Sequence, residues 1–132
     1  MGTSRSFEEK LQEDIYLLDD VTAVFKHDGV LSDYELGTMF HKLNTITNHL
    51  DQFYYIIDAQ GSQEVSAEQR RFLMKKLSEI SGKLIHISVV TGKNVFLNLL
   101  AKFVFGGIGF KSIKIHKTFK EAKDEILQQK NK

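Results

Sequence analysis

Apolar positions along the chain follow two spacings, one typical of strands and one typical of helices. Short β-prone runs at 15–18 and 21–26 flank Asp19-Asp20, which predicts a hairpin. Ser32-Asp33-Tyr34-Glu35 is a capping box, and apolar residues then recur at helical spacing to about residue 50. The continuous apolar run 53–57 predicts a strand that is buried on both faces. The first half therefore predicts a hairpin, a helix and a central strand.

The second half repeats the alternation of helix and strand. Ser66-Ala67-Glu68-Gln69 is a second capping box, and the helix that it opens is expected to end at Gly82. A strand at 84–90, a helix at 94–105 ended by Gly106-Gly107, and a short strand at 112–115 follow. Thr118-Phe119-Lys120-Glu121 then opens a C-terminal helix.

This order of elements predicts one α/β domain. We expect a mixed, mostly parallel sheet of about five strands, opened by the N-terminal hairpin and accompanied by about four helices. The domain is expected to span 14–130, after an N-terminal extension at 1–13. The length of 132 residues suits a single core.

Composition narrows the class of protein. The chain has no cysteine, which excludes disulfides, thiolate metal sites and a cysteine nucleophile. No stretch approaches the roughly 20 apolar residues of a membrane span, and the first residues lack the apolar run of a secretory signal, so a cytoplasmic protein is expected. Residues 1–79 hold eight Lys/Arg against fourteen Asp/Glu, whereas 80–120 hold seven Lys and no acidic residue. This asymmetry fits either an anionic partner or lysines spread around a solvated rim.

The element order resembles the STAS superfamily, and most closely its SpoIIAA-like branch of relatives of anti-sigma-factor antagonists. The resemblance covers about 14–128 and rests on Gly29-Val30-Leu31-Ser32 before the first helix, Ile56-Ile57-Asp58 in the central strand, and the loop to Ser66. It implies a regulatory or ligand-binding module.

Phosphorylated antagonists of this family carry an Asp-Ser pair at the end of that loop, with the serine as phosphoacceptor. The matching positions here are Ser66 and Ala67, so the acceptor is replaced by alanine. Two interpretations of Ser66 stay open. It is an N-cap whose hydroxyl accepts a hydrogen bond from the backbone of Gln69, or it is itself modified, in a phosphorylation-regulated switch.

A polar site is expected at the carboxyl ends of the strands, where open α/β sheets place ligands. Asp58 is expected to end its strand and to bind loop amides, and Gly92-Lys93 precedes the next helix. This is no Walker motif, because Ile87 stands where that motif requires glycine. An anion site and ordinary turn chemistry both fit these residues. The candidate residues are Asp58, Gly61, Ser62, Ser66, Thr91, Gly92 and Lys93.

The helix expected at 94–105 is apolar over most of its circumference. Asn94, Asn98 and Lys102 form one narrow polar stripe. A helix that covers a sheet needs an apolar stripe only about 100° wide, so part of the apolar surface is left over. The helix is therefore buried in the domain, or forms a homodimer interface, or meets an apolar ligand, a membrane surface or a protein partner. The residues of this surface are Phe96, Leu97, Leu100, Phe103, Val104 and Phe105.

No catalytic constellation is visible in the sequence. His41 and His49 are eight residues apart on one helix, and His86 and His116 lie in predicted strands without nearby carboxylates. We expect no metal and no cofactor. Nucleic-acid binding is not expected, because the pI is about 7.9 and the basic segment lacks interleaved exposed aromatics.

The sequence thus predicts a non-catalytic STAS-like module that binds through the segment 93–110. Two alternatives remain. One is the phosphorylation-regulated switch. The other is a small enzyme, which would need a pocket that gathers Asp58, a histidine and Lys93.

Overall fold

The computed structural model describes residues 15–29, 32–62, 66–93 and 112–131, together with Lys102 and Gly106. The expected N-terminal extension lies outside the described residues. So does most of the helix expected at 94–105, although Lys102 and Gly106 are both helical and exposed. The strands are β1 (Ile15–Asp19), β2 (Thr22–Gly29), β3 (Phe53–Ser62), β4 (Leu84–Val90) and β5 (Ile113–His116). The α-helices of the described part are α2 (Asp33–Thr47), α3 (Ala67–Ile80) and α5 (Phe119–Lys130).

The five strands form one mixed sheet whose spatial order is the chain order, β1-β2-β3-β4-β5. β1 pairs with β2 antiparallel, and all the other neighbours are parallel. This confirms the predicted α/β class, with its opening hairpin. The described residues hold three α-helices rather than the four expected, since the fourth falls on the segment that is not described.

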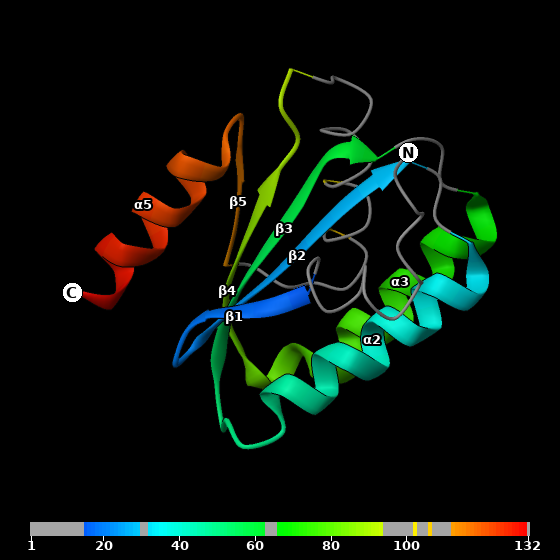
Figure 1. Ribbon diagram of the computed structural model, residues 1–132, viewed down its shortest axis with the longest axis horizontal. Coiled ribbons are helices and arrows are strands. Elements are labelled where there is room, and N and C mark those ends of the chain that lie inside the picture. The colour runs from blue at the N-terminus through cyan, green and yellow to red at the C-terminus, as the bar shows by residue number, and fades with distance from the viewer. Residues whose placement is uncertain are drawn as a thin grey trace, which may run out of the picture.

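Helices cover the two faces of the sheet unequally. Of the helices that the structure describes in full, α2 and α3 lie on one face and α5 lies on the other (Figure 1). The α2/α3 face holds the larger core, which includes Ile15, Phe25, Tyr55 and Ile87. The α5 face has a smaller core built on Val24, Tyr54, Ile56 and Val90 and closed by Ala122 and Ile126 of α5. Alternate residues of each strand thus serve two cores of different size.

Two strands run further than their apolar residues predict. β2 was expected to end near residue 26 and β3 near Asp58, but the ladder continues to the pair Gly29–Ser62. The register shifts between Lys26 and Asp28, which inserts an irregularity into β2. Polar residues extend the strands here because the backbones of β2 and β3 supply each other's hydrogen-bond donors and acceptors.

Side chains begin the helices where the capping boxes predict. Ser32, Ser66 and Thr118 each accept a hydrogen bond from the backbone amide three residues on. The end of α3 differs from the prediction. Ser81 is its C-cap, and Gly82 lies inside the 3-10 turn Ser81–Lys83 instead of ending the helix in a left-handed conformation.

Candidate functional site

Asp58 lies inside β3 and not at its end, which corrects the prediction from the sequence. Its register partners are Lys26 in β2 and Val90 in β4, and its side chain is only 6% exposed. The Oδ1 atom accepts hydrogen bonds from the backbone N and the side-chain Nε2 of Gln60, each at 3.2 Å. The expected bond to a backbone amide is therefore present, but it lies within the strand.

Gln60 connects the ends of β3 and β4. Gly92 has φ +64°, and a Cβ built there would lie 3.4 Å from the side chain of Gln60. Thr91 is buried, and its backbone N donates to the carbonyl of His116 at 3.0 Å. Asp58 and Gly92 thus come together through a residue that the sequence did not single out, next to the exposed Lys93.

The remaining candidates of the loop are structural in their described interactions. Gly61 and Ser62 continue β3 as register partners of Asp28 and Gly29. The hydroxyl of Ser66 accepts from the backbone N of Gln69 at 3.1 Å, and Gln69 Oε1 accepts from the backbone N of Ser66 at 3.0 Å. Both halves of the capping box are therefore formed.

A second polar cluster lies between the sheet and α5, and sequence reasoning missed it. Glu125 Oε1 contacts His86 Nε2 at 2.8 Å, Ser88 Oγ at 2.9 Å and His116 Nε2 at 3.0 Å. His86 Nδ1 lies 2.8 Å from Ser112 Oγ. We call His86, Ser88, His116 and Glu125 the Glu125 cluster. The two histidines do have a carboxylate beside them, contrary to expectation, because α5 supplies it.

Burial makes this cluster an internal one. The exposed fractions are 0% for Ser88, 3% for His86 and 9% for His116, and the Glu125 side chain is 13% exposed. An ionised carboxylate only accepts hydrogen bonds, so Nε2 of each imidazole and the hydroxyl of Ser88 donate to Glu125 Oε1. The three described contacts of this oxygen thus each pair a donor with an acceptor.

Burial alone would raise the pKa of Glu125, but hydrogen bonds from His116, His86 and Ser88 outweigh it, so the pKa lies below its ordinary value. Lys114 Nζ lies 3.7 Å from Glu125 Oε2, and His116 Nδ1 lies 3.9 Å from Glu121 Oε2. Within the described ranges, no group of three or more His, Cys, Asp or Glu side chains is placed to hold a metal ion.

One signal in the sequence points to this cluster. His86 and Ser88 are two apart in a strand, so they share a face, and Glu121 and Glu125 are four apart on a helix, so they also share a face. The pairing of those two faces depends on the position of α5 over β4 and β5. Local patterns do not contain that position.

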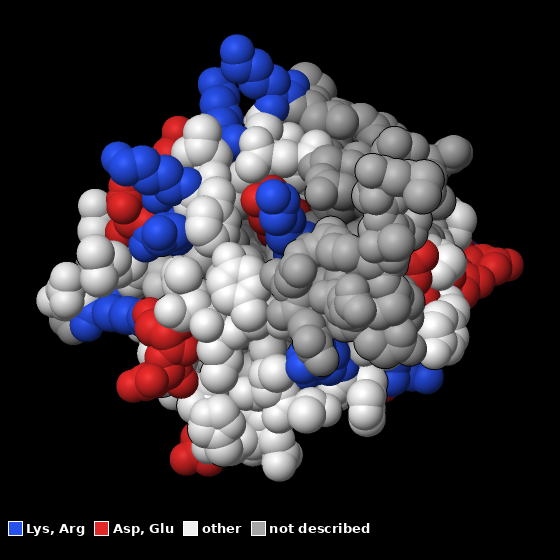
Figure 2. Space-filling view, viewed as in Figure 1, with Lys and Arg blue, Asp and Glu red and all other residues white. Residues whose placement is uncertain are grey.

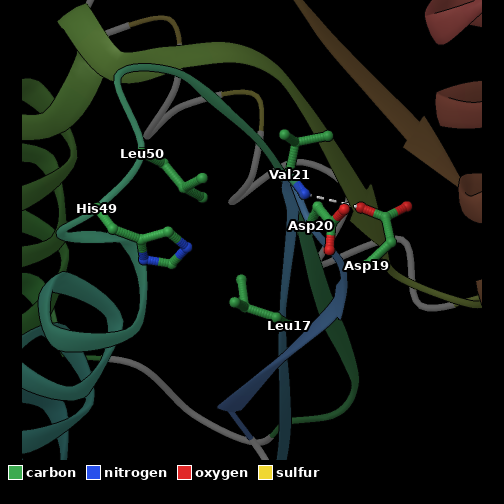
Figure 3. A pocket seen from close by; sticks show the side chains of 6 residues that line it. All are labelled: Leu17, Asp19, Asp20, Val21, His49 and Leu50. Atoms are coloured by element: carbon green, nitrogen blue, oxygen red, sulfur yellow. Dashed lines mark hydrogen bonds between the residues drawn. The ribbon is translucent and has the colours of Figure 1, made fainter.

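The described surface also has an open hollow of about 540 Å³ at the other edge of the sheet. Leu17, Asp19, Asp20 and Val21 of the hairpin line one side, and His49 and Leu50 line the other. Figure 3 shows the ring of His49 turned toward the hairpin and the carboxylate of Asp19 directed away from it. The hollow lies where β2 and β3 begin, opposite the edge at which ligands bind in open α/β sheets.

The apolar surface expected on the helix 94–105 lies outside the described residues. Phe96, Leu97, Leu100, Phe103, Val104 and Phe105 all belong to it. Lys102, which is described, is helical and exposed. No helix among the described residues is long and apolar enough to cross a bilayer.

Comparison with known proteins identifies a solved structure with a similar fold. No protein-family model matches the chain, and no curated protein matches it. The chain is similar to the crystal structure of an uncharacterised protein of the DUF3478 family, from Shewanella loihica, which has a SpoIIAA-like fold. The TM-score is 0.66 at 16% identity, over 83% of this chain and 88% of the other. The fold of the chain is therefore SpoIIAA-like, as the resemblance predicts.

Proposed function

We propose that this SpoIIAA-like domain is a non-catalytic regulatory module that binds an anionic lipid surface through the segment 93–110. The observation that carries the non-catalytic part is the closure of the Glu125 cluster. Its histidines, serine and carboxylate are the described groups best suited to proton transfer, and they are buried and bonded to one another.

A catalytic base must come within hydrogen-bond reach of a substrate proton. Ser88 is fully buried beneath α5, and a substrate could reach the cluster only if that helix moved. At the hollow beside His49, the Asp19 carboxylate accepts hydrogen bonds from Lys130 and the backbone of Val21.

Charge on the described surface argues against nucleic acid. Figure 2 shows basic and acidic side chains interspersed on the side where α5 lies. Lys120 pairs with Asp124 at 3.8 Å, and Lys114 lies beside Glu125. Nucleic-acid binding rests on a continuous basic patch, whereas these lysines are partly neutralised by their neighbours.

The lipid part of the proposal rests on the sequence of the segment and on three described lysines. Lys102 is exposed, as expected for the polar stripe of the helix that the sequence predicts at 94–105. Lys93 is exposed at the first position of the segment, and the side chain of Lys114 is 64% exposed shortly after its end. Lysines that flank an apolar helical face are typical of interfacial helices on anionic membranes.

Vesicle co-sedimentation tests the proposal. Full-length protein is sedimented with neutral and with anionic phospholipid vesicles at low and high salt, beside the variant Leu100→Glu/Phe103→Glu. We expect binding to anionic vesicles that weakens with salt and is lost in a variant whose circular dichroism is unchanged. Binding that is the same for both lipids and both chains would contradict the proposal. A wild-type dimer that the variant converts to monomer, without lipid binding, would assign the segment to a homodimer interface instead.

A further inference from the structure

The two faces of the sheet hold their helices by different means. Helix α2 buries five side chains, and Phe40 of α2 packs edge-to-face on Phe72 of α3 with ring centroids 6.1 Å apart. Helix α5 buries only Ala122 and Ile126 fully, and its Leu127 remains 59% exposed. The attachment of α5 therefore depends more strongly on polar contacts than that of α2.

Two carboxylates take part in those polar contacts, one on α5 (Glu125) and one on the β1–β2 hairpin (Asp19). In the middle of α5, Glu125 accepts from His86 and Ser88 of β4 and from His116 of β5. At the end of α5, Lys130 pairs with Asp19 of the β1–β2 hairpin and lies over the ring of Tyr54, 5.6 Å from its centroid. These contacts connect α5 to both ends of the sheet.

We propose that Glu125 is the centre of an acid-released latch that holds α5 on the sheet. While the carboxylate is charged, it accepts three hydrogen bonds and faces the ammonium of Lys114. Protonation removes the negative charge toward which His86, Ser88, His116 and Lys114 are directed, so Glu125 becomes a weaker acceptor for its three hydrogen bonds and no longer attracts the ammonium.

The other described groups near the cluster do not replace the negative charge of Glu125 at its centre. Glu121 Oε2 lies 3.9 Å from His116 Nδ1, but the side chain of Glu121 is more than half exposed, so solvent screens its charge. Ser112 is uncharged and bonds His86. On β3, Tyr54 contributes to the small core beneath α5, and Asp58 lies further along the same face, bonded to Gln60. Glu125 is therefore the central negative charge among the described groups of this interface.

The sign of the pH dependence follows from the hydrogen bonds. They lower the pKa of Glu125 in the folded chain, so its contribution to the attachment of α5 is complete above the ordinary carboxyl range. It is lost as the pH falls through the lowered value. The same holds for Asp19. Burial alone would raise its pKa, but hydrogen bonds from Lys130 and the backbone of Val21 outweigh burial, so the pKa lies below its ordinary value.

Hydrogen exchange measured by mass spectrometry on the full chain, from pH 7 to pH 3, tests the latch. Rates are corrected for intrinsic exchange, and peptides of α2 are the internal reference. We expect α5 to lose protection at a higher pH than α2. Loss of protection in both helices at the same pH would indicate global unfolding. That result would overturn the proposal.

Two variants separate Glu125 from other carboxylates. Glu125→Gln should raise the exchange rate of α5 amides roughly tenfold at pH 7, because the uncharged carbonyl oxygen of Gln is a weaker acceptor than the carboxylate. It should also make the exchange rate of α5 depend less on pH. Asp124→Asn is the matched control, since Asp124 is the preceding residue on α5, its side chain is exposed, and its described ion pair is with Lys120 one turn earlier on the same helix. Equal behaviour of the two variants would also overturn the proposal.

Discussion

Truncation of Glu125 measures how much stability depends on a single carboxylate. Glu125→Ala leaves three donors without their acceptor, namely the Nε2–H groups of His86 and His116 and the hydroxyl of Ser88. An unsatisfied buried donor costs about 1–3 kcal/mol, and removal of one partner from a buried ionic cluster costs about 3–5 kcal/mol in total. We expect the free energy of unfolding to fall by about 3–5 kcal/mol. Small domains have only about 5–15 kcal/mol in total.

Urea unfolding at pH 7, followed by circular dichroism, measures this change. Asp124→Ala is the control and should stay within about 0.5 kcal/mol of wild type, because the described ion pair of Asp124 with Lys120 is exposed to solvent. If Glu125→Ala costs no more than this control, the three hydrogen bonds do not operate in solution and the reasoning fails.

A fully apolar version of the cluster tests the source of the cost. Replacement of His86, Ser88, His116 and Glu125 together by Leu, Ala, Leu and Leu removes the donors as well as the acceptor. Buried ionic groups exchanged for apolar ones of similar volume are often neutral or stabilising by about 1–4 kcal/mol. We expect this variant to be more stable than Glu125→Ala. If it is less stable, the cost lies in packing and not in unpaired donors.

Substitutions at three further positions test other contacts, each by urea unfolding. Gly92→Ala should cost about 1–2 kcal/mol, because φ +64° is unfavourable for a residue with a Cβ, even though the nearest side chain, Gln60, leaves ordinary contact distance. Ser66→Ala should cost about 1 kcal/mol and Ser66→Asp much less, since aspartate also caps helices; equal losses would contradict the cap. Asp19→Asn should flatten the fall of stability below the ordinary carboxyl range, where the lowered pKa of Asp19 makes wild type lose its pair with Lys130. The effect should stay below about 1 kcal/mol because the pair is partly exposed.

The elements of this fold could be predicted from local patterns, and their ends only in part. The strand Leu84–Val90 was predicted to the residue, because a continuous apolar run has clear limits. The ends of β2 and β3 were missed, since Asp58, Gly61 and Ser62 are of types that favour turns. There the parallel ladder outweighs local preference, because neighbouring strands satisfy each other's backbone groups.

In the candidate site, too, local contacts could be predicted from the sequence and contacts between distant residues could not. The role of Ser66 as an N-cap follows from a spacing of three residues, and the structure confirms it. The Glu125 cluster could not be predicted that way, because Glu125 is 39 positions from His86 and 9 from His116. Gln60, which joins Asp58 to Gly92, was also missed. Its role depends on how the ends of two strands meet.

The unequal faces of the sheet explain why a polar cluster would lie in the interior of so small a domain. The α2/α3 face is held by many apolar contacts, and loss of any one of them leaves the others. Apolar contacts alone would let α5 shift along its smaller core, since they are not directional. Hydrogen bonds from β4 and β5 to one atom of Glu125 fix both the position and the rotation of the helix. The cluster therefore specifies one placement of α5, and its dependence on a single charge makes that placement sensitive to acid.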